Sequence, residues 1–139
     1  MNSSSSLRTA EANPAPRLST GIAGLDDILG GGLTAQRVYL VEGSPGAGKT
    51  TLGLQFLLDG AAKGEHGLYI TLSETIDELT AVATSHGWSI DGLSLFELAS
   101  DLALDIDAQQ SVFHPSEVEL GETTRNVMAE VDRVKPVRV

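Results

Sequence analysis

The chain has 139 residues, of which 41% are hydrophobic, a length and composition typical of one globular domain with a single core. Nineteen acidic residues outnumber nine basic ones, and the net charge of −10 disfavours unassisted binding to nucleic acid or to an anionic membrane. The sequence contains no cysteine, no apolar run long enough to cross a bilayer and no secretory signal, so we expect a cytoplasmic protein without disulfides, thiolate-bound metal or membrane contact.

The N-terminal residues 1–16 include four consecutive serines and two prolines. Such a segment buries too little apolar surface to offset the entropy of ordering it, and we expect a disordered leader.

Residues 19–33, STGIAGLDDILGGGL, contain a short helical pattern. Leu25, Ile28 and Leu29 recur at helical spacing, which predicts a helix that buries this face and ends at Gly30 in a left-handed cap. Asp26 and Asp27 fall on the opposite face. Adjacent carboxylates can carry acid–base chemistry, but a solvated helix surface is the interpretation we favour.

A strand, a glycine-rich loop and a helix follow in that order. The mostly apolar run RVYLVE, residues 37–42, predicts a buried strand. Apolar residues recur at helical spacing over residues 50–62 and predict a helix. Between them GSPGAGKT, residues 43–50, matches the phosphate-loop pattern in both glycines, the lysine and the hydroxyl.

This arrangement predicts binding of a nucleoside triphosphate. Glycines let successive backbone N–H groups converge on phosphate oxygens, and the helix adds its positive N-terminal end. We expect ATP and magnesium as cofactors, with Lys49 at the β- and γ-phosphates and the Thr50 hydroxyl on the metal. The alternative, a glycine-rich connection without a ligand, fits the full pattern less well. The predicted nucleotide-binding residues are Gly43, Ser44, Pro45, Gly46, Ala47, Gly48, Lys49, Thr50 and Thr51.

Together with the earlier run STGIAGLDDILGGGL, the run EGSPGAGKTTLGLQFL resembles the opening of a KaiC-type ATPase domain of the RecA/RadA superfamily. The likeness is specific over residues 17–58 and continues more weakly to the end of the chain. It implies an α/β fold, a three-layer RecA-like P-loop NTPase core with a mostly parallel sheet. It also implies ATP at the subunit boundary of a homo-oligomeric ring, commonly a hexamer, and signalling proteins as partners.

The next predicted strand, residues 67–72, is joined to the first by a right-handed crossover. Ligands in such sheets lie beyond the carboxyl ends of the strands, where Ser73 and Glu74 follow. KaiC-type domains have two adjacent glutamates here, and the resemblance maps the second onto Glu74 while Ser73 replaces the first. We therefore predict Glu74 as the catalytic carboxylate that orients or deprotonates water, alongside Lys49. The alternative is an acidic residue that complements the dipole of the next helix.

Thr75 and Glu78 match a capping box at the start of a helix that buries Leu79, Val82 and Ala83 and ends at Gly87. Residues 93–98 predict a third strand. Trp88 precedes it as a packing anchor, an interpretation we prefer to stacking on adenine. His66 and His86 are expected at the surface or at caps rather than as ligands.

The acidic residues 100–119 fit no calcium loop, and we expect a solvated connection. A helix is predicted from about Leu120 to Lys135, before Pro136, and residues 137–139 are expected to begin another strand. The predicted buried stripe of this helix is Val127, Met128, Val131 and Val134.

In the resemblance, this last helix leads to the strand that bears the Walker B aspartate. We therefore expect residues 17–139 to form the N-terminal part of a KaiC/RecA-like ATPase domain, truncated before that aspartate and very weak in hydrolysis alone. The predicted function is ATP binding and, in the complete domain, ATP hydrolysis by a regulatory or signalling ATPase. We also consider Ser/Thr autokinase activity for this protein. A RadA-like recombinase in DNA repair and a non-catalytic nucleotide-binding module are the alternatives.

Overall fold

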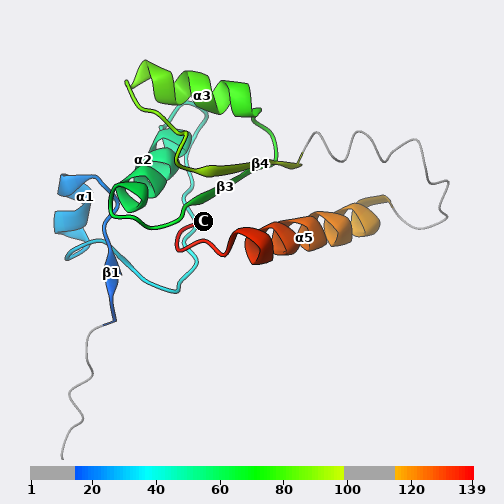
Figure 1. Cartoon of the computed structure of the whole chain (residues 1–139), viewed down its shortest axis with the longest axis horizontal. Coiled ribbons are helices and arrows are strands. Elements are labelled where there is room, and N and C mark those ends of the chain that lie inside the picture. Colours follow the sequence, from blue (N-terminus) through cyan, green and yellow to red (C-terminus); the bar gives the residue numbers. More distant parts are fainter. Residues whose placement is uncertain (1–14, 99–114) are drawn as a thin grey trace, which may run out of the picture.

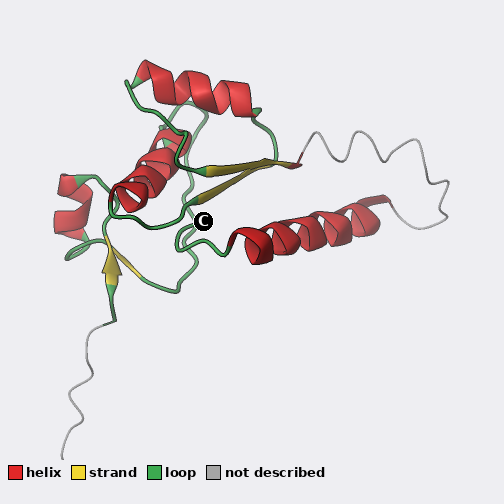
Figure 2. Ribbon diagram, viewed as in Figure 1, coloured by secondary structure: helices red, strands yellow, loops and turns green. Residues whose placement is uncertain are grey.

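The computed structural model describes residues 15–98 and 115–139, with the side chains of residues 115–119 outside that description. Residues 1–14 of the leader and most of the acidic segment over residues 100–119 lie outside the described residues. A small antiparallel pair, β1 (Arg17–Leu18) and β2 (Leu33–Thr34), brackets the short helix α1 (Ala23–Ile28). The main elements are α2 (Lys49–Ala62), β3 (Leu68–Thr71), α3 (Ile76–Ser85), β4 (Ser94–Glu97) and α5 (Pro115–Val134) (Figure 2).

β3 and β4 form a parallel pair connected through α3, with Leu68 opposite Ser94 and Thr71 opposite Glu97. On the other edge of β3, the Leu68 N–H donates to the Arg138 carbonyl at 2.9 Å, and a parallel bridge joins Gly67 to Arg138. The predicted strand at residues 137–139 is therefore present as this single bridge. Figure 1 shows α3 and α5 on opposite sides of the strand pair. The α/β architecture with parallel strands agrees with the fold class predicted from the sequence.

The hydrophobic core lies between α2, α3 and the turn that leads into β4. Trp88 packs against its edge and stacks on His86 with ring centroids 4.6 Å apart, so the predicted packing role of Trp88 is confirmed. The buried members of this core are Leu54, Leu57, Leu79, Ala83, Ile90 and Leu93.

The local helix signals of the sequence are confirmed. The Thr75 hydroxyl accepts from the Glu78 N–H while the Glu78 carboxylate accepts from the Thr75 N–H, which completes the predicted capping box of α3. The helix-terminating glycines Gly30, Gly64 and Gly87 have φ values of +65°, +80° and +72°, conformations that favour glycine over residues with a Cβ.

Two predictions about α1 are wrong. Ile28 is 84% exposed, so the apolar face is not buried as a unit. Asp26 is not a solvated carboxylate, since it accepts hydrogen bonds from the N–H and the hydroxyl of the buried Thr20 at 2.8 and 2.7 Å. This short helix is thus attached to the preceding segment through a polar contact that helical periodicity does not reveal.

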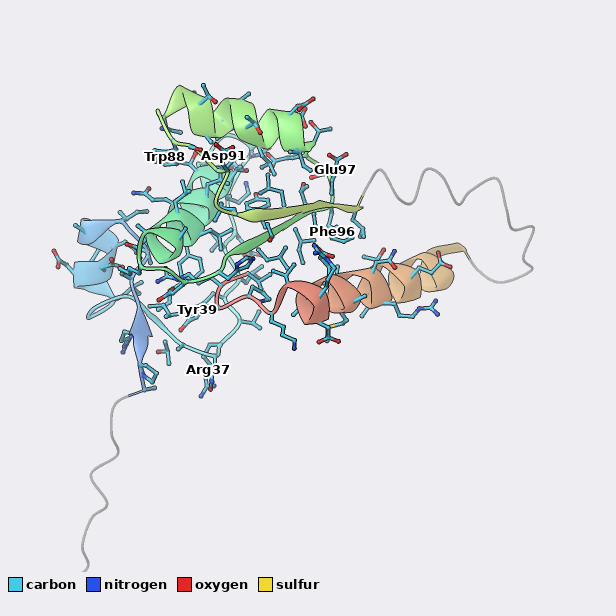
Figure 3. All side chains as sticks on the ribbon, viewed as in Figure 1. Arg37, Tyr39, Trp88, Asp91, Phe96 and Glu97 are labelled. Atoms are coloured by element: carbon cyan, nitrogen blue, oxygen red, sulfur yellow. The ribbon has the colours of Figure 1, made fainter. Side chains whose placement is uncertain are left out.

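The strand predicted over residues 37–42 is also absent. Within residues 15–98 and 115–139 no strand pairs with this segment, and Val38 and Leu40 are 100% and 83% exposed. An apolar run becomes a strand only where a neighbour supplies hydrogen-bond partners for its backbone. The Tyr39 hydroxyl instead bonds to the backbone of Thr34. Figure 3 shows Arg37 and Tyr39 on this extended segment, apart from Phe96 and Glu97 on β4.

The last helix, α5, begins at Pro115 rather than near Leu120 and ends at Val134, before Pro136. Val127, Val131 and Val134 are half-buried as predicted, but Met128 is 55% exposed and does not belong to the buried stripe. Among the helices in the described ranges, none has both the length and the apolar character required to span a bilayer.

Candidate nucleotide-binding site

The phosphate loop leads directly into α2. Gly46 and Gly48 have φ values of +80° and +91°, and no atom lies within 4 Å of where a Cβ would stand on either residue. The two glycines are therefore required by backbone conformation, and the space beside them is open. Ser44, Pro45 and Ala47 are exposed members of the loop, and the Ala47 N–H donates to the Ser44 carbonyl at 3.1 Å to close a turn.

The N-terminus of α2 has no side-chain cap. Gly48 is the N-cap residue, and the helix starts at Lys49, followed by the half-buried Thr50 and Thr51. The first N–H groups of a helix have no partner within it, and the helix dipole places positive charge at that end. An uncapped helix start behind an open glycine loop is suited to an anion such as a phosphate.

The Lys49 ammonium lies over the loop. Its Nζ donates to the carbonyl oxygens of Gly43 and Ser44 at 2.7 and 3.0 Å, and the side chain is exposed. The positive charge therefore lies at the open side of the loop. Phosphate oxygens could replace the two carbonyl oxygens as acceptors of its hydrogen bonds.

Thr50 and Glu74, predicted separately, meet in the structure. The Thr50 hydroxyl donates to both carboxylate oxygens of Glu74, with Oγ1 3.1 Å from Oε1 and 3.2 Å from Oε2. The carboxyl end of β3 thus approaches the first turn of α2. Ser73, by contrast, is exposed and adds no carboxylate.

The backbone of Glu74 is fixed by Thr71, a residue that the sequence analysis did not select. The Thr71 hydroxyl accepts from the Glu74 N–H at 2.9 Å and donates to the Glu74 carbonyl at 2.8 Å. Thr71 itself is buried. The signal available in the sequence was a threonine three residues before the carboxylate, a spacing typical of hydroxyl-closed turns.

Tyr69, also unselected, lies on β3 near this corner of the site. Burial, followed by the negative charge of Glu74, raises the pKa of Tyr69 above its usual value of 10.0. The ring also lines an apolar pocket of about 160 Å³ beside Gly53 and Val139. Tyr69 and Thr71 are two residues apart on one strand, so they share a face, a relation visible in the sequence once β3 is placed.

This set of residues fits a triphosphate with its magnesium ion. The loop and the start of α2 offer backbone N–H groups and one ammonium for phosphate oxygens, and Thr50 and Glu74 offer the oxygen ligands that magnesium prefers. Glu74 is close enough to Thr50 to act on a cation held there, or on a water molecule beside it.

Comparison with known proteins identifies relatives of this chain. The family model for the KaiC ATPase matches residues 18–139. A UPF0273 protein from Thermotoga maritima is 34% identical over 119 residues, which cover 86% of this chain and 46% of the relative. The circadian clock oscillator protein KaiC of Parathermosynechococcus lividus is 40% identical over 85 residues, 60% of this chain and 16% of that protein.

A solved structure of a KaiC-like protein from Pyrococcus horikoshii has the same fold, with a TM-score of 0.65 and 25% identity over 88% of this chain and 51% of that one. The chain spans less than half the length of the curated relatives named above. The family match extends over nearly all of the sequence beyond the leader, and the chain belongs to the KaiC ATPase family.

Proposed function

We propose that this chain binds ATP with magnesium at residues 43–51 and that, in a complete ATPase domain, it supplies part of the machinery for hydrolysis. The observation that carries the proposal is the Lys49 ammonium, which lies over a glycine loop that opens onto the uncapped start of α2. A cation, free backbone donors and a helix N-terminus converge on one place, which favours a polyphosphate over a neutral ligand.

The roles of the remaining residues follow from their contacts. The Thr50 hydroxyl would hold magnesium, which neutralises charge on the phosphates when bound. Glu74 is proposed to orient or deprotonate the attacking water, with its backbone held by Thr71. Assembly into a ring, contact with signalling proteins and Ser/Thr autokinase activity are proposed from family membership, as properties of the whole protein.

A non-catalytic nucleotide-binding module is the second candidate. It is favoured by the exposed Ser73 at the position where the resemblance leads one to expect a carboxylate. Both functions require nucleotide binding, and they differ only in whether Glu74 supports turnover.

Nucleotide binding is tested by titrating ATP with magnesium into the purified chain in a calorimeter. Wild type should bind, and Lys49→Ala should weaken binding by at least about tenfold, because a hydrogen bond to a charged group contributes roughly 1.5–3 kcal/mol. Lys135→Ala removes the same charge outside the loop and should bind like wild type. Absence of binding by the folded wild type would overturn the proposal.

Hydrolysis is tested with Glu74→Gln in the protein that carries the whole ATPase domain. ATP affinity should be retained, while turnover should fall by about 100-fold to 10,000-fold, the range typical of a positioned base. Equal turnover in the variant would refute the assignment of Glu74, and absence of turnover in wild type would favour the non-catalytic module.

A further inference from the structure

We propose that Glu97 is a positioning residue for Glu74, because it anchors the connection between β3 and α3 that carries the Glu74 carboxylate. This inference rests on the proposed role of Glu74 in hydrolysis. Glu97 lies at the carboxyl end of β4, outside the phosphate loop, and Figure 3 shows it near the start of α3.

Two neighbouring strands end side by side at this edge of the sheet. β3 ends at Thr71 and β4 ends at Glu97, and these two residues are paired in the parallel register. Paired residues of neighbouring strands direct their side chains to the same face of a sheet. The Thr71 hydroxyl and the Glu97 carboxylate therefore share one face at the point where the chain leaves β3.

These two side chains hold opposite ends of the connection. The Thr71 hydroxyl bonds to the N–H and the carbonyl of Glu74 at 2.9 and 2.8 Å. Two residues further on, the Ile76 N–H donates to Glu97 Oε2 at 3.0 Å in a partly buried hydrogen bond. The connection over residues 74–76 is thus fixed by both strands rather than by β3 alone.

The Glu97 contact provides what the local cap of α3 does not. Thr75 and Glu78 complete a capping box, but its hydrogen bonds join residues within the start of the helix. They therefore do not determine where this start lies relative to the sheet. Ile76 is the first residue of α3, and its N–H has no acceptor within the helix. The Glu97 carboxylate accepts from this N–H, which attaches the helix start to β4 and places a negative charge at the positive end of the helix dipole.

The position of this connection affects the candidate site through Glu74. The Glu74 carboxylate meets the Thr50 hydroxyl of α2 at 3.1 and 3.2 Å. A shift of the helix start away from β4 would pull on the Glu74 backbone and move the carboxylate away from Thr50. A misplacement of about 1 Å in a catalytic group can cost about 100-fold in rate. The Lys49 ammonium and the loop N–H groups do not depend on this connection, so ATP affinity should be insensitive to Glu97.

The test measures steady-state ATP hydrolysis by the protein that carries the whole ATPase domain. Glu97→Met keeps the length of the side chain but has only a weak acceptor. Its kcat should fall by about tenfold to 100-fold, with the KM for ATP within about twofold of wild type. Glu97→Gln retains an oxygen that can accept from the Ile76 N–H and should keep kcat within about threefold of wild type.

A matched control separates positioning from the stability of α3. Ala83→Gly weakens the same helix at its other end, because glycine has a lower helix propensity than alanine. It should lower the Tm and leave kcat unchanged. Amide hydrogen exchange gives a readout besides activity. Exchange at Ile76 should be about tenfold faster in Glu97→Met than in wild type, and close to wild type in Glu97→Gln.

The outcomes that overturn the inference are distinct from failure of the proposed function. Wild-type kcat in Glu97→Met would overturn the inference alone, as would a loss in Ala83→Gly as large as that in Glu97→Met. An equal loss of kcat in Glu97→Gln and Glu97→Met would also contradict it, because the hydrogen bond would then not be what matters. If wild type shows no turnover, the proposed hydrolysis fails and this inference with it.

Discussion

Thr71 lies at the carboxyl end of β3, and its hydroxyl bonds to both backbone groups of Glu74. A valine of almost the same shape would fill the same space and would satisfy neither group. At the scale of single residues, the backbone position of Glu74 in the candidate site therefore depends on the Thr71 hydroxyl. The Thr71 hydroxyl supplies the hydrogen-bond partners that a neighbouring strand would supply to Glu74 if β3 continued further.

Thr71→Val should lower the free energy of unfolding by about 1–3 kcal/mol, because it leaves the backbone N–H and carbonyl of the half-buried Glu74 without these partners. Urea unfolding followed by circular dichroism measures this change. Thr80→Val removes a hydroxyl that bonds to the Ile76 carbonyl on the exposed side of α3 and should change stability by less than about 0.5 kcal/mol. Equal losses in the two variants would contradict the role assigned to Thr71.

At the scale of one element, α2 contains two glycines in different surroundings. A Cβ on Gly53 would meet only the Tyr69 ring, at 3.5 Å. A Cβ on Gly60 would stand 2.6 Å from Arg138 Nε and 2.7 Å from Arg138 Cδ. Gly60 is thus the point where the arginine passes over the helix. Helix propensity alone would place alanine at both positions.

Alanine substitutions at these two glycines should change the stability of the chain in opposite directions. Gly53→Ala should stabilise the chain by about 0.5–1 kcal/mol, the usual gain for alanine over glycine inside a helix. Gly60→Ala makes the same gain in propensity but displaces a buried ion pair, and it should destabilise the chain. Thermal unfolding of both variants measures the difference, and a rise in Tm for Gly60→Ala would show that Arg138 moves aside at little cost.

At the scale of the whole molecule, one buried cation connects segments far apart in the sequence. Arg138 Nη1 donates to the carbonyls of Ser19 at 2.7 Å and Phe56 at 2.9 Å and to Asp59 Oδ2 at 3.3 Å, while Nε donates to Glu65. The guanidinium also lies 4.6 Å from the centroid of the Phe56 ring. The N-terminal segment, α2 and the C-terminal segment are therefore joined at one point.

This cluster predicts how stability depends on pH. Burial alone would raise the pKa of Asp59, but hydrogen bonds from Lys63 and Ser19 and the charges of Lys63 and Arg138 outweigh it and lower the pKa below its usual value. A carboxyl with a lowered folded-state pKa contributes stability above its unfolded pKa of about 3.9, and that contribution is lost as the pH falls through the folded value.

Asp59→Asn should be less stable than wild type at pH 7, and the gap should narrow as the pH falls from about 5 to below 3.9. Urea unfolding at a series of pH values measures both profiles. The ion pair of Glu130 and Arg133, in which Arg133 lowers the pKa of Glu130, is present in both proteins and cancels in the difference. Parallel profiles would refute the contribution of Asp59.

Sequence alone was sufficient where structure depends on residues close together in the chain. The phosphate loop, α2, the capping box of α3 and the glycine caps are each formed by contacts within a few positions, so residue type and spacing determine them. Because these contacts are local, the sequence also predicted that Lys49 and Thr50 lie at the start of a helix.

Tertiary structure decided what depends on distant partners. The run over residues 37–42 has the composition of a strand, but no strand of the described residues lies beside it, and its side chains remain exposed. The contact between Thr50 and Glu74 forms only when β3 meets α2, and Arg138 acquires its role only when the C-terminal segment crosses Gly60. Strand pairing, burial and ion-pair formation each depend on two segments that meet in space. The sequence pattern of one segment therefore does not predict them.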